Sequence, residues 1–349
     1  SDGVVHAANT RQIANVAAGT EGTDAVNLDQ LNAVAGTASH YLAATGNGDG
    51  SDDAQALGEY GTAVGSGSFA MGNQSSAFGS SASALGEFAT AAGYGSVAQG
   101  DHSAAFGDNA QATGASSIAI GQDSNSQAGA GVALGAASQT QGWGAVAVGG
   151  QSAASGMGAT AIGMFASADG FQNATAVGLA ATAGGWNSVA LGGGSWGNGM
   201  FATSVGAESQ ALDFGVALGQ GTYADAGGTA LGTQSSAGSG GVAVGGTASA
   251  WGDHALALGS NALAGMDASS VTKGDFTTAV GGEAWATEDG ASVLGYNSYA
   301  QAVNSTVLGS NAWVTKDAAN SVSLGSESLA DRANTVSVGA AHEWTSSDG

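Results

Sequence analysis

A short apolar triplet that ends in a glycine recurs along most of the chain. Val132-Ala133-Leu134, Val146-Ala147-Val148 and Val189-Ala190-Leu191 are examples, and every residue in them is apolar. Because successive residues of a strand point to opposite faces, this pattern predicts a strand that is covered on both sides. Segments such as Ser152-Ala153-Ala154-Ser155 lie between the triplets and alternate small with polar residues. They predict a second strand with one covered face and one face in water.

The glycines that close the triplets are spaced 14 residues apart, with slips of one residue, and a second set falls at the half-period. The closing glycines are Gly107, Gly121, Gly135, Gly149, Gly163, Gly178, Gly192, Gly206, Gly219, Gly232, Gly245 and Gly259. A fixed period predicts a solenoid, and this one is too short for a strand plus a packed helix. We therefore expect an all-β roll of roughly 20 coils, on the order of 100 Å long at the spacing of neighbouring strands.

A coil made of two short strands leaves interior room for Ala, Ser and Gly. The larger Val, Leu and Ile side chains of the triplets should therefore point out of the roll. In a lone chain they would form an apolar stripe far beyond the few hundred Å² that a monomer normally exposes. Another copy of the same stripe is the simplest cover, so the pattern predicts a homo-oligomer.

The composition narrows the possible partners. The chain has 349 residues, 63 of them Gly, no Pro and no Cys, and a formal net charge of −23. Its four cationic side chains are Arg11, Lys273, Lys316 and Arg332. A surface of this sign repels phosphate, which argues against nucleic acid and against anionic membranes. The lack of proline suits a parallel ladder, which needs a backbone N–H from every coil.

The first 37 residues break the repeat. The stretch from Arg11 to Gly36 ends in a predicted short helix, with Thr23 or Asp24 as the N-cap and an apolar spacing that includes Leu28 and Leu31. A helix of this length is not stable alone, so it too should have partners.

Two motifs resemble those of one protein family. The N-terminal segments are similar to the neck of trimeric autotransporter adhesins, and NSVALG (187–192) and NSVSLG (320–325) resemble the repeat of their YadA-like heads. The neck-like segments are Arg11-Gln12-Ile13, Asn15-Val16-Ala17-Ala18-Gly19-Thr20, Thr23-Asp24-Ala25-Val26-Asn27 and Gln30-Leu31.

The resemblance implies a left-handed parallel β-roll and a homotrimer around one axis. It also implies a fibre on the outer membrane of a Gram-negative bacterium, which attaches to host extracellular-matrix protein, glycan, cells or other surfaces. On this basis residues 1–37 form a neck and short coiled-coil connector, 38–60 lead into the head, and 61–349 form the head with an insertion near 265–276. A signal peptide and membrane anchor are expected outside this chain, and no membrane insertion within it.

Three functions fit such a roll to different degrees. The favoured one is an adhesin head that acts by avidity. A structural spacer or self-association module for autoagglutination or biofilm needs the same roll. A polysaccharide-processing solenoid would need acids, or an acid with Arg or Lys, on neighbouring coils, and the few cations and scattered acids disfavour it. We expect no enzyme activity, no catalytic residue and no cofactor.

Metal binding has one weak candidate. Oxygen-bearing side chains occur at every second position, as in a calcium-binding loop, at Asn47, Asp49, Ser51 and Asp53. The segment lacks the flanking helices and the closing Glu of such a loop. A solvated turn is the favoured interpretation. The histidines show no metal-ligand spacing, so structural or surface roles are expected for His6, His40, His102, His254 and His342.

Aromatic residues recur at one phase of the repeat, four residues after the closing glycines. The set comprises Trp285, Tyr299 and Trp313, with Leu329 at the same phase and Trp196 and Tyr223 earlier. They should stack outward as a ladder. The ladder could be a platform for sugar or protein, or cross-coil stacking that stabilises a thin roll, and the structural interpretation is favoured.

Overall fold

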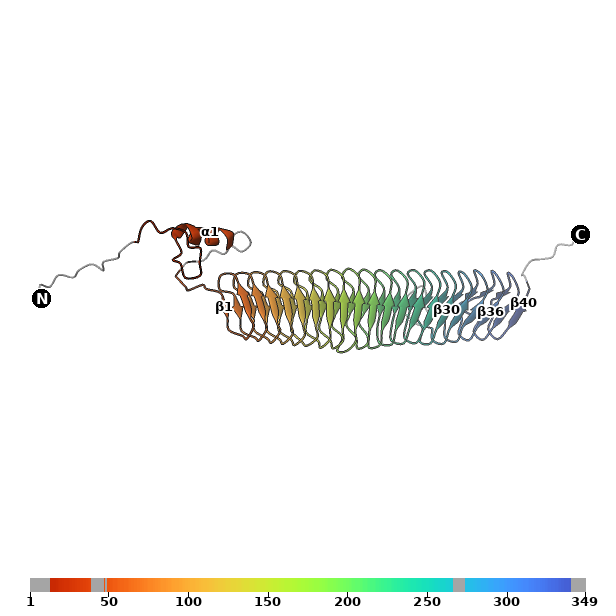
Figure 1. Ribbon diagram of the computed structural model, residues 1–349. Helices are drawn as coiled ribbons and strands as arrows, with labels where there is room; N and C mark the ends of the chain where they lie inside the picture. Colours follow the sequence, from red (N-terminus) through yellow and green to blue (C-terminus); the bar gives the residue numbers. More distant parts are fainter. Residues whose placement is uncertain (1–12, 39–46, 48, 266–273, 340–349) are drawn as a thin grey trace, which may run out of the picture. The chain divides into compact units, whose positions relative to one another are not determined.

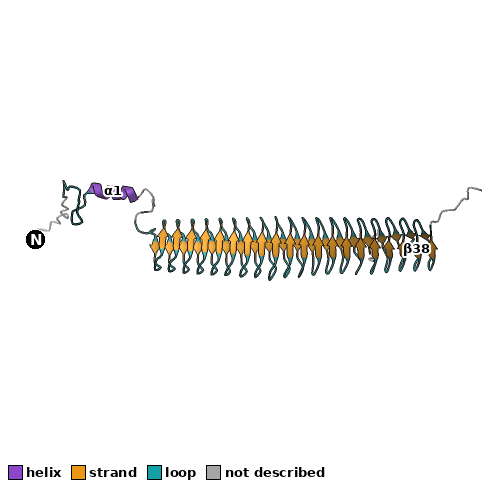
Figure 2. Cartoon of the chain, turned by 45° about the vertical axis from the view of Figure 1, so that its right-hand side comes forward, coloured by secondary structure: helices purple, strands orange, loops and turns teal. Residues whose placement is uncertain are grey.

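The computed structural model describes residues 13–38, 47, 49–265 and 274–339. The chain divides into two compact units between Asp53 and Ala54. The first unit holds helix α1 (Leu28–Ala38), and the second is a roll of 40 short strands, β1 to β40 (Figures 1 and 2). The predicted all-β parallel roll of about 20 coils is confirmed.

Helix α1 begins with a capping box. The Asn27 side-chain oxygen accepts from the Gln30 N–H at 2.9 Å, and the Gln30 side-chain oxygen accepts from the Asn27 N–H at 3.3 Å. Each side chain therefore satisfies one helix-terminal donor. The predicted N-cap at Thr23 or Asp24 is wrong, because the Asp24 carboxylate accepts instead from the N–H groups of Thr20 and Glu21.

The capping pair also holds the preceding loop. Gln30 both donates to the Gly19 carbonyl and accepts from the Gly19 N–H, each at 2.9 Å, and the Asn27 amide donates to the Val16 carbonyl at 3.2 Å. These residues belong to the neck-like segments, so the motif encodes a loop tied to the first turn of a helix.

The strands of the roll form two sheets, which we call the narrow sheet (strands of two residues) and the wide sheet (strands of three). The narrow sheet consists of β1 (Gln55–Ala56), β3 (Phe69–Ala70), β5 (Ser83–Ala84), β7 (Val97–Ala98), β9 (Gln111–Ala112), β11 (Asn125–Ser126), β13 (Gln139–Thr140), β15 (Ala153–Ala154), β17 (Ser167–Ala168), β19 (Thr182–Ala183), β21 (Trp196–Gly197), β23 (Gln210–Ala211), β25 (Tyr223–Ala224), β27 (Ser236–Ala237), β29 (Ser249–Ala250), β31 (Leu263–Ala264), β33 (Trp285–Ala286), β35 (Tyr299–Ala300), β37 (Trp313–Val314) and β39 (Leu329–Ala330).

The wide sheet consists of β2 (Thr62–Val64), β4 (Ser76–Phe78), β6 (Thr90–Ala92), β8 (Ala104–Phe106), β10 (Ile118–Ile120), β12 (Val132–Leu134), β14 (Val146–Val148), β16 (Thr160–Ile162), β18 (Thr175–Val177), β20 (Val189–Leu191), β22 (Thr203–Val205), β24 (Val216–Leu218), β26 (Thr229–Leu231), β28 (Val242–Val244), β30 (Leu256–Leu258), β32 (Thr278–Val280), β34 (Ser292–Leu294), β36 (Thr306–Leu308), β38 (Val322–Leu324) and β40 (Val336–Val338). Each strand pairs in parallel with the equivalent strand of the next coil, as Val132 does with Val146 and Gln139 with Ala153.

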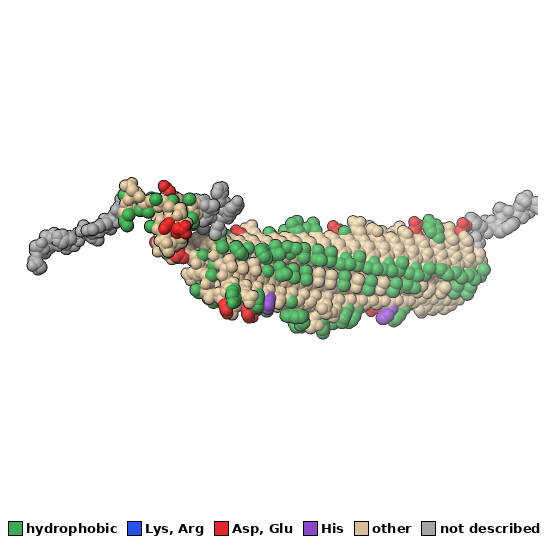
Figure 3. All heavy atoms as spheres, in the orientation of Figure 1, with side chains coloured by type: hydrophobic (Ala, Val, Ile, Leu, Met, Phe, Trp, Pro, Cys, Tyr) green, Lys and Arg blue, Asp and Glu red, His purple; other side chains and the backbone are tan. Residues whose placement is uncertain are grey.

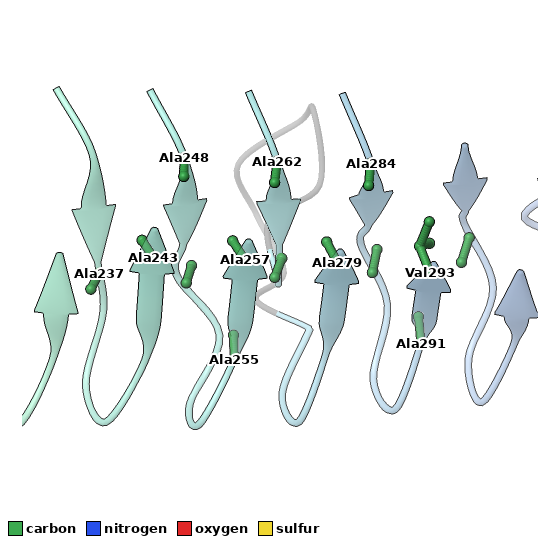
Figure 4. Close-up of a cluster of buried hydrophobic side chains, with 14 of the residues drawn as sticks. Ala237, Ala243, Ala248, Ala255, Ala257, Ala262, Ala279, Ala284, Ala291 and Val293 are labelled. Carbon is green, nitrogen blue, oxygen red and sulfur yellow. The ribbon is translucent and has the colours of Figure 1, made fainter. Parts of the chain in front are cut away.

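The interior between the two sheets is filled almost entirely by small side chains. In the central coils the middle residue of each wide strand and the second residue of each narrow strand point inward, as Ala147 and Ala154 do. Figure 4 shows such alanines facing one another across neighbouring coils. The largest fully buried side chains are Val293, Val307 and Val314. The expectation of a thin interior that accepts little more than Ala and Ser is confirmed.

The two sets of repeat glycines have different physical causes. Gly149, which closes a triplet, has φ +129°, a backbone conformation that residues with a Cβ avoid. Gly142, at the half-period, is needed for close approach, because a Cβ there would lie 1.8 Å from the Gly156 carbonyl oxygen of the next coil.

The two turns of each coil differ in how much length they tolerate. The turn from a wide to a narrow strand, here the constant turn, has four residues in every coil, for example 135–138 and 259–262. The turn from a narrow to a wide strand, here the variable turn, usually has five residues, but it has four at 225–228, seven at 315–321 and thirteen at 265–277. The predicted insertion also falls on a variable turn, and its residues 266–273 lie outside the described residues.

Replacing a glycine of the constant turn should destabilise the roll. For Gly149→Ala we expect a loss of about 1–3 kcal/mol, because Ala cannot hold this φ without strain and its Cβ would lie 2.6 Å from the Gly163 carbonyl. Thermal unfolding followed by circular dichroism measures the effect.

The matched control is Gly144→Asn in the adjoining variable turn. Gly144 has φ +65°, with open space where a Cβ would stand, and Asn tolerates that conformation, so the change should stay within about 0.5 kcal/mol. Equal unfolding midpoints for the two variants would contradict this account of the closing glycines.

Candidate interaction surfaces

The wide sheet presents one outward residue that is apolar in every coil. The third residues of its strands form this wide-sheet stripe: Val64, Phe78, Ala92, Phe106, Ile120, Leu134, Val148, Ile162, Val177, Leu191, Val205, Leu218, Leu231, Val244, Leu258, Val280, Leu294, Leu308, Leu324 and Val338. Many remain substantially exposed in the single chain, for example Leu134 at 41% and Leu308 at 43%. Figure 3 shows hydrophobic side chains in a continuous band along the roll. A stripe of 20 rungs exceeds what a monomer leaves in water.

The outward face of the narrow sheet is mostly polar in the first half of the roll. Its outward position is occupied by residues such as Gln111, Asn125, Gln139 and Ser167 in the first half of the roll. The two faces of the roll are therefore chemically different, and the wide sheet is the one that requires a cover.

Large side chains stack in a ladder on the last narrow strands. Leu263, Trp285, Tyr299, Trp313 and Leu329 are paired neighbours on five successive coils. The rings of Trp285 and Tyr299 lie 5.4 Å apart, edge to face, and those of Tyr299 and Trp313 lie 5.7 Å apart, tilted. The predicted stacking is thus present for this part of the set.

The earlier aromatics do not join this ladder. Trp196 lies between Thr182 and Gln210, so it has no aromatic neighbour in its own column. Tyr223 stacks at 5.7 Å with Trp251, a residue of the variable turn that follows β29, two coils later. Partial burial, followed by the nearby Asp225 carboxylate, raises the pKa of the Tyr223 phenol.

A groove of about 390 Å³ lies beside the N-terminal end of the ladder. Its lining comes from four successive coils and includes Ser249, Leu263, Trp285 and Tyr299. The outward residue changes here from the small Ser249 to the large Leu263 and Trp285, which explains the depression.

A second group of exposed apolar side chains lies on the variable turns and was missed in the sequence. Each member directly follows a half-period glycine, on five successive coils. We call this group the turn ridge; it comprises Trp143, Met157, Phe171, Trp186 and Met200. Trp143 is 67% exposed, and Trp186 stacks with Phe201 at 6.4 Å. Their even spacing after known repeat glycines was the available signal.

The calcium candidate forms a compact turn. The Asp49 carboxylate accepts from the Ser51 hydroxyl and from the Ser51 N–H, and these bonds lower the pKa of Asp49. The Asn47 N–H donates to Asp52 rather than to another residue of the candidate set. Among the described residues there is no group of three or more His, Cys, Asp or Glu side chains able to hold a metal. Calcium binding through Asn47, Asp49, Ser51 and Asp53 stays a prediction.

The two histidines in the described part of the chain stack on phenylalanines. His102 lies 4.8 Å from Phe88 and His254 lies 5.6 Å from Phe276, with nearly parallel rings. His6, His40 and His342 lie outside the described residues. Within the part that the structure describes, no helix is long and apolar enough to cross a membrane.

Comparison with known families decides the identity of this fold. The profile described as the YadA head domain repeat matches nine segments that together cover more than half of the chain: 52–68, 70–96, 98–124, 141–166, 172–195, 237–262, 273–298, 286–312 and 300–328. The profile described as the coiled stalk of trimeric autotransporter adhesin matches residues 12–54. The chain belongs to the trimeric autotransporter adhesins. It contains a YadA-type head, and membership implies a homotrimer.

Adhesins of this type are exposed at the cell surface, and an adhesin role follows for this head. Among solved structures the chain is similar to the collagen-binding domain of the Yersinia adhesin YadA, at 27% identity over 46% of this chain and 69% of that one, with a TM-score of 0.28. No curated protein sequence matches the chain significantly.

We expect the trimer to supply the cover that the wide-sheet stripe needs. Replacing Leu134 and Val148 together by Glu should therefore disrupt the trimer, because an unpaired charge buried at an interface costs at least about 3 kcal/mol. Sedimentation velocity at matched concentration measures the oligomeric state.

The control double variant is Gln139→Glu with Ala153→Glu, which places the same charges on the narrow sheet of the neighbouring strands β13 and β15. It should remain trimeric. If the control dissociates and the wide-sheet variant does not, the assignment of the two faces is reversed.

Proposed function

We propose that this chain is the neck and head of a bacterial surface fibre and attaches the cell to extracellular-matrix protein, host cells or other surfaces. The observation that supports this proposal most directly is the chemical difference between the outward faces of the wide and narrow sheets. The wide-sheet stripe serves assembly, which leaves the narrow sheet and the turns of three chains to face outward. The fibre is anchored in the outer membrane of a Gram-negative cell in this proposal.

Attachment by such a head is multivalent. Each chain carries the same outward surface, so a trimer presents three equivalent copies, and a second contact forms at a high effective concentration once the first is made. Weak individual contacts are then sufficient for firm attachment. The proposal assigns no catalytic residue and requires no cofactor.

The small number of cations argues against attachment through contacts with anionic groups of the target surface. Two of the four cations, Lys316 and Arg332, lie in the described part of the roll, both on variable turns near its C-terminal end. Arg332 forms an ion pair with the neighbouring Asp331, at 3.5 Å, and both side chains are exposed. Attachment to uncharged groups of the target surface should therefore persist at moderate salt.

The test is a binding series with the purified trimer on immobilised collagen, fibronectin and laminin and on fixed cells. We expect saturable binding to at least one of these surfaces at low and at moderate salt. The dissociated Leu134→Glu, Val148→Glu variant should bind at least about 100-fold more weakly, because avidity is lost.

The competing function is self-association between fibres. It predicts that beads coated with the trimer agglutinate one another while the trimer fails to saturate any of the tested surfaces. That combination would replace attachment by a spacer or self-association role, whereas saturable binding without agglutination supports the adhesin.

A further inference from the structure

The groove beside the ladder has one aromatic wall and one polar wall. Its principal lining residues are Thr247, Ser249, Asn261, Leu263, Glu283 and Trp285. With neighbouring coils about 4.8 Å apart, its four coils span roughly 14 Å along the roll. The volume of about 390 Å³ lies within the range of small-molecule sites, about 300–1,000 Å³.

The side chains of the aromatic wall are held in place by contacts with one another and with neighbouring residues. Tyr299 packs edge to face on Trp285, and its hydroxyl donates to the Asn297 side-chain oxygen at 2.7 Å. Leu263, which lies on the preceding coil, is the strand partner of Trp285. These two neighbours restrict the rotation of the Trp285 side chain, so little entropy is lost when a ligand packs against the part of it that lines the groove.

The polar wall is a column on successive constant turns. Thr247, Asn261 and Glu283 occupy the third position of their turns, with φ between 55° and 57°. Because each stands two residues before an outward residue of the narrow sheet, the column runs parallel to the ladder. All three side chains are exposed.

This column offers both kinds of hydrogen-bonding group. The Thr247 hydroxyl lies within hydrogen-bond distance of the Gly246 carbonyl and of the Asn261 carboxamide, and its single proton can go to only one of them. The Asn261 carboxamide itself carries both an oxygen acceptor and an N–H₂ group. No other described residue accepts from this N–H₂ group, and the Glu283 carboxylate has no partner among the described residues. The groove thus combines N–H donors, a carboxylate acceptor and an aromatic ring.

We propose that this groove binds a neutral pyranose unit of a surface glycan. The inference rests on the proposed adhesin function and names a ligand class for it. A pyranose has a C–H face that packs on the negative face of an aromatic ring, and a rim of hydroxyls. The hydroxyls donate to Glu283 and accept from Asn261. Stacking on Trp285 supplies area, and the polar column supplies orientation.

The charge of the lining selects against acidic sugars. Among the described residues that line the groove, Glu283 is the only charged one, so a carboxylate or sulfate on the ligand would meet repulsion from it. A proline-rich helix, the main alternative for an aromatic groove, docks on aromatic-lined surfaces. Half of the eight lining residues here are polar, which favours the sugar.

The test titrates the purified trimer with the methyl glycosides of glucose, galactose, mannose and N-acetylglucosamine, and with glucuronic and N-acetylneuraminic acids. Binding is followed by saturation-transfer NMR and tryptophan fluorescence. We expect saturation by at least one neutral glycoside, with a Kd of about 1 mM for a single sugar, and none by the acids. Trp285→Ala should weaken binding at least about tenfold, and Glu283→Gln should also weaken it.

The matched control is Trp143→Ala, which removes an exposed tryptophan from the turn ridge and should leave the Kd unchanged. Trp285→Phe keeps a ring in the groove and should retain part of the affinity, and sedimentation checks that each variant is trimeric. Equal losses for Trp143→Ala and Trp285→Ala would overturn the proposal. So would saturation by the acids, or binding of a (Pro-Pro-Gly) repeat peptide with no binding of any glycoside.

Attachment to the protein and cell surfaces is measured in parallel. If no glycoside binds while the trimer still attaches, the glycan assignment fails and the adhesin function stands. If attachment is absent as well, the proposed function fails with it.

Discussion

The narrow space between two short β-strands is the constraint on which the rest of this structure depends. Only side chains as small as those of Ala154 and Ser152 are buried throughout most of the interior, and the few fully buried valines mark its upper limit. A thin interior cannot hold enough apolar surface to stabilise a chain of this length. The larger apolar side chains must therefore lie outside the roll, and assembly completes the core that folding of one chain leaves unfinished.

The same constraint separates the parts of a coil that are fixed from those that can change. The constant turn has one length in every coil, and in nearly every coil it begins with a glycine whose positive φ other residues avoid. The variable turn and the outward position of the narrow sheet tolerate different lengths and different side chains. The turn ridge and the aromatic wall of the groove beside Trp285 lie at these tolerant positions, where side chains can change without disturbing the hydrogen bonds between strands. The polar wall of the groove stands on constant turns, at a third position whose side chain differs from coil to coil.

The sequence was sufficient to predict the architecture of the roll, because the repeat period can be read along the whole chain. Both sets of repeat glycines, the two strands per coil and the outward triplet residues could be predicted from spacing alone. The N-cap at Asn27 was missed because Thr23, Asp24 and Asn27 are all good capping residues, and only the contact with Gln30 distinguishes them. Trp196 was wrongly grouped with Trp285, because equal phase does not guarantee an aromatic neighbour on the next coil. The groove could not be predicted, since it arises from a change in side-chain size between β29 and β31 together with a polar column on other turns.

A crystal structure of the purified head tests the central claim most directly, because it shows both the number of chains and the sheet that faces the symmetry axis. The account predicts three chains whose wide-sheet stripes, including Leu191 and Leu308, pack around a three-fold axis, with the narrow sheets outward. A single folded chain with a wetted stripe, or a trimer built on the narrow sheets, would contradict it.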